Sequence, residues 1–347
     1  METRKIQSVG GGTYTVSIPK DWAEAQGITT GDRVGLHRHI DGILAIQAPE
    51  CESSDPSRIT VHLGETETNA IEHVLRAAYA VGTKEVRLIN SETFTVEQQR
   101  VIDRVARNLT GVSVVEDSET EIRVKTLLDT DEVSVTQTVR QLRFVVLSMH
   151  RDATAALTRE TDPDQFAERD NQADRLHAMI SRSFARGIRR LEEVDALGVP
   201  RSELFDLWAT TRELERVGDH AGGIGAVSQS LDSTVDQTLI AETRDIADGA
   251  REVVADAVSV VIDDAGVETV QEVLAARDQI RDAVSAFDRR FSVGSADQLR
   301  LDPVLHRLRR TAEHGGNIAE IGLQQAIRSG ELTATETGEP PSRNPSP

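Results

Sequence analysis

The chain has 347 residues, a formal net charge of −19 at pH 7, 3% aromatic residues and one cysteine. A single cysteine excludes an internal disulfide and is typical of a reducing compartment. No apolar run approaches the ~20 residues that a membrane helix needs. We therefore predict a cytoplasmic protein without membrane insertion.

The basic residues are almost all arginine. Only four of the 39 basic residues are lysine, while Asp and Glu together number 58. Strong self-repulsion of this kind destabilises a compact protein in dilute salt and is relieved by screening. This composition favours a protein adapted to a salty cytoplasm, as in halophilic archaea.

Residues 1–50 predict a small β unit with four short strands. Thr13–Ile18 alternates as a strand does, and a short helix is expected at Asp21–Gln26. The Asp41-Gly42 pair between the apolar runs Arg33–His39 and Ile43–Gln47 is a strong hairpin signal. Fifty residues of this kind bury little apolar surface alone, so we expect this unit to form a homodimer.

This first unit resembles the SpoVT/AbrB-like DNA-binding family, above all in the runs VSIPK and TGDRV. The resemblance implies a swapped-hairpin β-barrel whose basic residues bind DNA. The unit carries a net charge of −1 and the other 297 residues carry −18; phosphate contacts come from Lys and Arg. A plain dimerisation barrel and an antitoxin-type module are the alternatives. The candidate DNA-binding residues are Arg4, Lys5, Lys20, Arg33 and Arg38.

Residues 58–130 predict a small α/β region, because strand-like and helix-like segments alternate there. The segment contains no Gly-rich phosphate loop and no catalytic signature. We expect its role to be spacing or ligand sensing, and the sequence does not distinguish the two. The expected strands are Ile59–Leu63, Glu85–Ile89, Val112–Val115 and Glu121–Leu127, and the expected helices are Glu67–Val81 and Val96–Leu109.

The rest of the chain is helical and repeats once. LERVGDHAGGI at residues 214–224 aligns with LRRTAEHGGNI at residues 308–318, an offset of 94 residues. A repeat of this length in helical sequence predicts two three-helix bundles, at residues 133–231 and 238–330. One of the expected turns is at Asp302-Pro303. Residues 333–347, with four prolines and no apolar pattern, predict a disordered tail.

Two acids in the first copy point to a metal site. Glu215 and Asp219 are four residues apart, so both carboxylates project from one face of the predicted helix. A hard cation would turn their repulsion into a binding site, and Gly218, Gly222 and Gly223 would let a second helix approach. The alternative is a solvated acidic stripe.

The segment ERVGDH resembles the second signature helix of the PhoU family, and ERDNQADRL supplies the first signature as Asp170 and Asp174. The resemblance implies tandem helical bundles and a metal site at Asp170, Asp174, Glu215 and Asp219, with iron, zinc, manganese or magnesium as the ion.

The second copy differs from the first at the positions of these acids. Arg309 and Glu313 replace the second pair, and the first pair falls near Arg281 and Ser285. Positive charge in a carboxylate cage abolishes a metal cluster. We therefore predict a metal site in the first bundle only, and an ion pair between Arg309 and Glu313.

Together these features predict a multidomain α+β protein: a swapped-hairpin barrel, a small α/β region and tandem three-helix bundles. The two resemblances imply a DNA-binding regulator of phosphate uptake that senses phosphate status or a phosphate ABC transporter, and not an enzyme. The alternatives are a scaffold that modulates the transporter without binding DNA, and a metal-dependent phosphoesterase.

Overall fold

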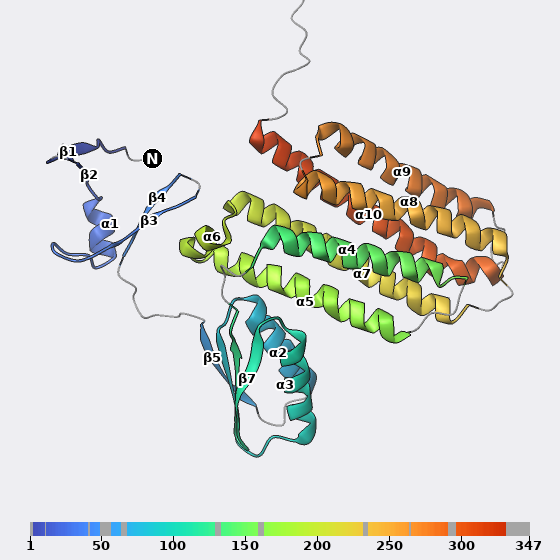
Figure 1. Ribbon diagram of the computed structural model, residues 1–347, viewed down its shortest axis with the longest axis horizontal. Helices are drawn as coiled ribbons and strands as arrows, with labels where there is room; N and C mark the ends of the chain where they lie inside the picture. The colour runs from blue at the N-terminus through green and yellow to red at the C-terminus, as the bar shows by residue number, and fades with distance from the viewer. Residues whose placement is uncertain are drawn as a thin grey trace, which may run out of the picture. The chain divides into compact units, whose positions relative to one another are not determined.

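The chain divides into two compact units, Met1–Asp55 and Pro56–Pro347 (Figure 1). Cys51, Asp41 of the predicted hairpin turn and the predicted tail at residues 333–347 lie outside the described residues. The computed structural model describes residues 3–10, 12–40, 42–48, 57–63, 68–128, 133–158, 163–231, 235–263, 265–290 and 296–330.

The first unit consists of two antiparallel hairpins and one short helix. Its described strands form two separate pairs, β1 with β2 and β3 with β4, and do not close a barrel within one chain. Gly42, with φ at +75°, donates a backbone hydrogen bond to the His39 carbonyl at 3.0 Å in the β3–β4 turn. The elements are β1 (Gln7–Val9), β2 (Thr13–Thr15), α1 (Lys20–Ala25), β3 (Gly35–Arg38) and β4 (Leu44–Gln47).

This unit has almost no interior of its own. Among its described residues only His39 is buried. Exposed apolar area of this extent on a small module is typical of a surface that another chain covers. Nine large apolar side chains are exposed: Ile6, Val9, Tyr14, Val16, Ile18, Leu36, Ile40, Ile43 and Leu44.

The second unit begins with a two-layer α/β region. Its four-stranded sheet has the order β5-β6-β8-β7, with β5 parallel to β6 and β8 antiparallel to both neighbours. The helices α2 and α3 cover one face of this sheet (Figure 1). The elements are β5 (Arg58–Leu63), α2 (Thr68–Ala80), β6 (Glu85–Asn90), α3 (Val96–Asn108), β7 (Val112–Asp117) and β8 (Glu121–Thr126).

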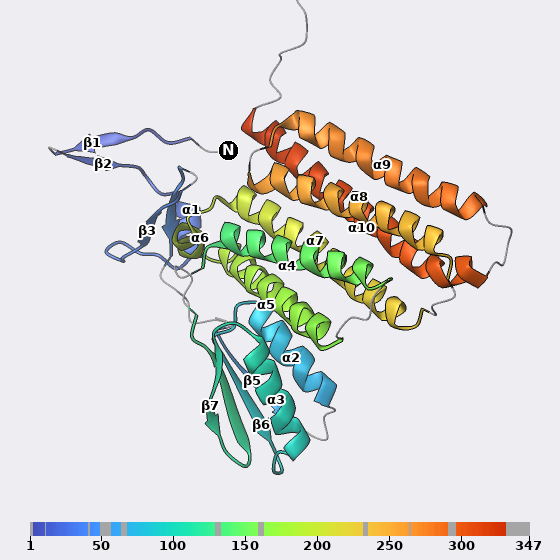
Figure 2. The ribbon, with the colours of Figure 1, turned by 45° about the vertical axis from the view of Figure 1, so that its right-hand side comes forward.

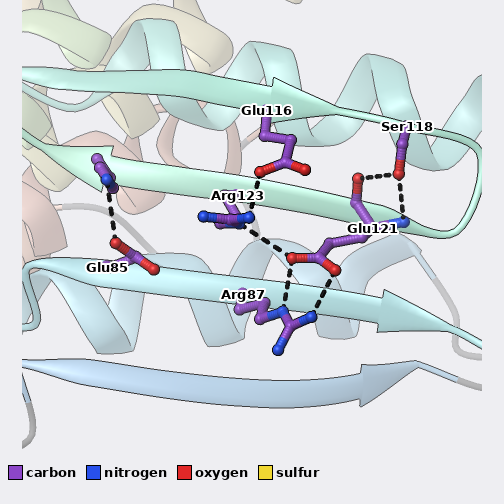
Figure 3. Close-up of polar contacts among 7 residues, drawn as sticks. Glu85, Arg87, Glu116, Ser118, Glu121 and Arg123 are labelled. Carbon is purple, nitrogen blue, oxygen red and sulfur yellow. Dashed lines mark hydrogen bonds and ion pairs between the residues drawn. The ribbon is translucent and has the colours of Figure 1, made fainter.

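Ion pairs between strands cover the other face of the sheet (Figure 3). Glu121 accepts hydrogen bonds from Arg87, at 2.5 Å, and from Arg123, at 3.0 Å, and Arg123 also pairs with Glu116. The hydrogen bonds from Arg87, more than those from Arg123, lower the pKa of Glu121 to about 2. Alternation along the strands thus separates an apolar face from a charged one.

Long helices make up the rest of the unit and run alongside one another (Figure 2). None of the described helices is both long enough and apolar enough to cross a membrane. The helices are α4 (Val135–Ala155), α5 (Pro163–Gly187), the short α6 (Leu191–Leu197), α7 (Arg201–Gln229), α8 (Gln237–Ile262), α9 (Val267–Arg290) and α10 (Ala296–Ser329).

The two predicted bundles share one hydrophobic core. The helices α4, α5 and α7 come from the first copy and α8, α9 and α10 from the second, and one cluster of buried side chains spans all six. The helix α10 packs against α7 as well as against α8 and α9, and α4 packs against α8. The copies are therefore joined as one body.

The predicted turn at Asp302-Pro303 is wrong, because α10 runs through Pro303. Proline removes one helical hydrogen bond and costs about 3 kcal/mol in a helix interior. Leu301, Val304 and Leu305 are fully or almost fully buried around it, and each contributes about 1.5–3 kcal/mol. Their burial outweighs the cost of the proline.

Arg182 on α5 anchors the α/β region to the helices. Its side chain is 3% exposed and donates to the carbonyls of Tyr79 at 3.0 Å and Thr83 at 2.8 Å, at the end of α2. The guanidinium also lies 5.0 Å from the centre of the Tyr79 ring. Burial lowers the pKa of Arg182 to about 10, which leaves it charged at neutral pH.

Candidate functional site

Four half-buried or exposed carboxylates lie on two neighbouring helices. Asp170 and Asp174 project from α5, and Glu215 and Asp219 project from α7. We call these four residues the acid patch. The i,i+4 spacing places each pair on one face, and α5 packs against α7 through buried residues beside the acids, such as Ala173 and Leu214.

Burial and neighbouring acids raise the pKa values of three carboxylates of the acid patch. Burial, followed by the charges of Asp174 and Asp219, raises the pKa of Asp170. Burial and Asp219 raise the pKa of Asp174, although Arg76 opposes them. Burial, Asp219 and Asp174 raise the pKa of Glu215 against the opposing charge of Arg216. The negative charge is thus only partly compensated.

Two arginines contact the acid patch. The Nη1 atom of Arg216 lies 3.5 Å from Oδ2 of Asp219, and its Nε atom lies 3.6 Å from Oε2 of Glu215. Arg76, on α2 of the α/β region, reaches Asp174 at 4.0 Å. Within the described part of the chain, no three or more His, Cys, Asp or Glu residues are arranged to hold a metal ion. The metal site therefore stays a prediction, and so does the alternative of a solvated stripe.

In the second copy, arginines form ion pairs at the positions that correspond to the acid patch. The Nε atom of Arg309 lies 3.1 Å from Oε1 of Glu313, which confirms the predicted ion pair. Arg281 pairs with Asp278 at 3.0 Å. The apolar positions of the repeat keep their role, since Leu308 and Ile318 are buried as Leu214 and Ile224 are.

The three glycines of the motif differ in their surroundings. A methyl group on Gly223 would lie 2.1 Å from Nε of Arg307, so an arginine of α10 lies directly against this residue. At Gly218 the nearest atom, from Val146, would be at an ordinary 3.6 Å, and Gly222 has no neighbour within 4 Å. The close approach expected at all three glycines thus occurs at Gly223.

A second polar cluster joins the two copies, and sequence reasoning missed it. Oε2 of Glu213 on α7 lies 2.7 Å from Nδ1 of His314 on α10 and accepts a hydrogen bond from Asn317 at 2.9 Å. The rings of His220 and His314 lie 5.3 Å apart. His220 thus faces α10 rather than the acid patch. The repeat alignment could have indicated this pair, because the two histidines occupy equivalent positions.

The five candidate DNA-binding residues are all exposed. They are spread over the chain before β1, the start of α1, the loop before β3 and the end of β3. Lys20 lies 3.4 Å from Glu24 in an exposed pair. In the adjacent loop Asp32 accepts hydrogen bonds from the backbone and hydroxyl of Thr29, and these bonds, the backbone one first, lower the pKa of Asp32.

Comparison with known families gives two matches. Residues 7–48 match the family described as antidote-toxin recognition MazE, bacterial antitoxin. Residues 139–227 match the PhoU domain, over the helices of the first copy. A comparison with curated proteins finds no match.

One similar solved structure is the crystal structure of the phosphate transport system regulatory protein PhoU from Streptococcus pneumoniae. The identity is 18% and the TM-score is 0.44, over 58% of this chain and 96% of that chain. The two family matches confirm the resemblances seen in the sequence, while the halophilic origin stays a prediction. The chain therefore carries a MazE/AbrB-like antitoxin-type module at its N-terminus and a PhoU domain in its helical part.

Proposed function

We propose that this protein is a non-enzymatic, DNA-binding regulator of phosphate uptake. The observation that carries the proposal is the fusion of a MazE-type module, with five exposed basic side chains, to a PhoU domain. In this proposal the helical part senses phosphate status, through a bound cation or through a phosphate ABC transporter. The first unit then changes its occupancy of promoter DNA.

The exposed apolar surface of the first unit supports the DNA-binding part of the proposal, because it favours a dimer. The nine exposed apolar side chains belong to both hairpins, so a second copy would supply the core that one chain lacks. A swapped-hairpin barrel would form in this way from two chains. The first unit carries a net charge of only −1, so its basic side chains could approach DNA phosphates. The rest of the chain, with a net charge of −18, would repel them.

The acid patch would be the cation site. Carboxylate oxygens are the ligands that hard cations such as Mg²⁺ and Mn²⁺ prefer, and iron and zinc also accept them. Asp170, Asp174, Glu215 and Asp219 would hold the ion, with a rearrangement that brings the two helices' carboxylates together. Arg76 of α2 contacts Asp174. A cation bound by Asp174 would compete with this contact, so cation binding would affect the α/β region.

Cation binding predicts a gain in stability that depends on Asp219. At a free cation concentration ten times Kd, we expect an increase of ~1.4 kcal/mol in the free energy of unfolding. Replacing Asp219 with asparagine should abolish this gain, whereas D282N, on an exposed site of α9, should keep it. Thermal unfolding in EDTA and with each of Mg²⁺, Mn²⁺, Zn²⁺ and Fe²⁺, together with metal analysis, measures this. An equal gain in D219N and wild type would contradict the site.

In the metal-free protein, repulsion within the acid patch should make the free energy of unfolding depend on pH. The folded-state pKa values of Asp170, Asp174 and Glu215 are raised. The folded state thus binds more protons than the unfolded state between the two sets of pKa values, and stability falls as pH rises through that window. The fall of the free energy of unfolding with pH should be less steep in D219N, because one negative charge next to the other three acids is gone.

Promoter binding is tested by a genome-wide map of DNA bound by the tagged protein in phosphate-rich and phosphate-starved cells. We expect peaks upstream of phosphate-transport genes whose occupancy changes with phosphate. Joint replacement of Arg4, Lys5 and Lys20 by glutamine should remove these peaks, since each is a candidate phosphate contact. The variant K84Q, whose charge lies in the α/β region, should keep them.

The same variants give a sharper result in solution. With purified protein and a bound promoter fragment, the triple variant should reduce the steepness of log affinity against log salt by about 3 relative to wild type.

In the genome-wide map, the absence of peaks in both phosphate conditions would contradict the DNA-binding proposal. The protein would then act as a scaffold that modulates a transporter, with the first unit as its dimerisation device.

A further inference from the structure

An arginine-lined groove lies where the two helical copies meet. It has a volume of about 630 Å³ and runs between α4 of the first copy and α8 of the second. Pockets that hold small molecules measure about 300–1,000 Å³. The groove is therefore large enough for a ligand of nucleotide size, and neither the acid patch nor the first unit contributes to it.

The charge of the groove opposes the charge of the protein. Four arginines and two acids line it, which gives a net charge of +2 in a chain of net charge −19. Three of the arginines, Arg140, Arg143 and Arg151, come from α4, and Arg251 comes from α8. Guanidinium groups bind phosphate oxygens through paired hydrogen bonds. The groove thus favours a ligand with several negative charges.

The three arginines of α4 that line the groove have hydrogen-bond donors beyond those used in their existing contacts. Arg140 donates to the carbonyl of Ile262 and to Asp263, both at 3.0 Å, and Arg143 shares Asp263 at 3.4 Å. Arg151 donates to Ser148 at 3.2 Å, and its Nε atom lies 3.8 Å from Oδ1 of Asp152. Each guanidinium has five N–H donors, so these contacts leave several for a ligand.

Arg251 presents a buried donor without a partner. Its Nη2 atom donates to Asp248 at 2.6 Å, while its Nη1 atom is buried and has no hydrogen-bond partner among the described residues. Buried polar atoms are hydrogen-bonded in most native structures, and an exception calls for an unseen partner. Because Arg251 lines the groove, an anionic ligand that reaches Nη1 would supply that partner.

An exposed aromatic ring lies among the arginines. Phe144, on α4, lines the groove and is 72% exposed, although the next two residues, Val145 and Val146, are buried. A phenyl ring beside guanidinium groups offers a stacking surface for a base next to sites for phosphate. Inorganic phosphate would leave this ring exposed, whereas a nucleotide would cover it.

The geometry points to a binding site for a nucleoside polyphosphate in the groove between α4 and α8, with its phosphates on Arg143, Arg151 and Arg251 and its base on Phe144. Because Arg143 and Arg251 belong to different copies, the ligand would bridge the two halves of the helical core. This site is separate from the acid patch and does not rest on the proposed function.

Calorimetric titration of the full-length protein in EDTA tests the site without metal. ATP should bind, adenosine should not, and pyrophosphate should bind at least tenfold more weakly than ATP. R151Q, R143Q and R251Q should each weaken ATP binding at least tenfold. R289Q, at an exposed arginine on α9, should leave it within twofold. F144A should weaken ATP about tenfold and leave pyrophosphate unchanged. Thermal unfolding confirms that each variant is folded; R151Q, with its side chain 62% exposed, is the variant least able to disturb the fold.

Four results would overturn the site. Pyrophosphate binding as tight as ATP, with no effect of F144A, would show an anion site without base recognition. ATP binding that D219N abolishes and the arginine variants keep would place the nucleotide at the acid patch. An equal loss in R289Q would show unspecific charge attraction. Binding of a polyglutamate peptide but of no nucleotide would make the groove a protein-docking surface. None of these results bears on promoter binding, so the proposed function is tested separately.

Discussion

Replacing Arg328 with alanine is expected to lower the free energy of unfolding by about 3 kcal/mol. Arg328, near the end of α10, donates to Oδ2 of Asp206, which is 1% exposed near the start of α7. Breaking a buried ion pair by removing one partner costs about 3–5 kcal/mol, because a charge stays buried without compensation. The lower end applies here since the Arg328 side chain is itself 42% exposed.

The loss in R328A should depend on pH. Burial raises the pKa of Asp206, although Arg328 opposes the shift, and removing the arginine leaves burial unopposed. The folded state of R328A then binds a proton that the unfolded state does not, so its stability rises as pH falls toward the raised pKa. Urea unfolding at pH 5 and pH 7.5 measures this. The difference in the free energy of unfolding between R328A and wild type should be smaller at pH 5 than at pH 7.5.

A second substitution serves as the control. In the double variant D206N/R328A no charge is buried, so most of the loss at pH 7.5 should be restored. A single variant R328A within 1 kcal/mol of wild type at pH 7.5 would show that water, rather than Arg328, compensates the carboxylate.

Replacing Gly315 with alanine is expected to cost about 3 kcal/mol, at the upper end of the range for overpacking. The new methyl group would lie 2.7 Å from Cγ1 of Val253, and 3.1 Å and 3.2 Å from backbone atoms of Val254 and Val253. Backbone cannot turn aside as a flexible side chain can. The helices α8 and α10 would have to separate, and the gain of about 1 kcal/mol in helix propensity cannot offset this.

Gly222 on α7 provides the matched control. It lies in a helix and belongs to the repeated motif, but no atom beyond its chain neighbours and its own helix backbone lies within 4 Å of an added methyl group. We therefore expect G222A to stabilise the protein by about 0.5–1 kcal/mol. Chemical denaturation of both variants under one set of conditions gives the comparison. Equal effects in G222A and G315A would show that helix propensity, and not packing, governs these positions.

The elements of the α/β region could be predicted closely from the sequence. The predicted strand at Glu85–Ile89 is observed at Glu85–Asn90, because Val86 and Leu88 alternate with the charged Glu85 and Arg87. The repeat also carried enough information to place Arg309 beside Glu313, since the two lie one helical turn apart. Local periodicity determines both results.

The sites between helices could not be predicted in the same way. Spacing places Asp170 with Asp174, and Glu215 with Asp219, but the distance between the two pairs depends on how α5 packs against α7. The groove needs Arg143 and Arg251 together, and nothing in their local sequence relates them. The continuation of α10 through Pro303 likewise depends on tertiary burial that outweighs a local signal.

The contact of α10 with α7 has a consequence for synthesis on the ribosome. The chain between the end of α7 at Gln229 and the end of α10 at Ser329 is roughly 100 residues, which takes about 5–20 s to translate. During this interval the face of α7 that carries Asp206 and Glu213 has no partner helix. The nascent first copy therefore presents to solvent acids and apolar side chains that α10 covers in the folded protein. We expect it to need chaperone protection until the last helix emerges.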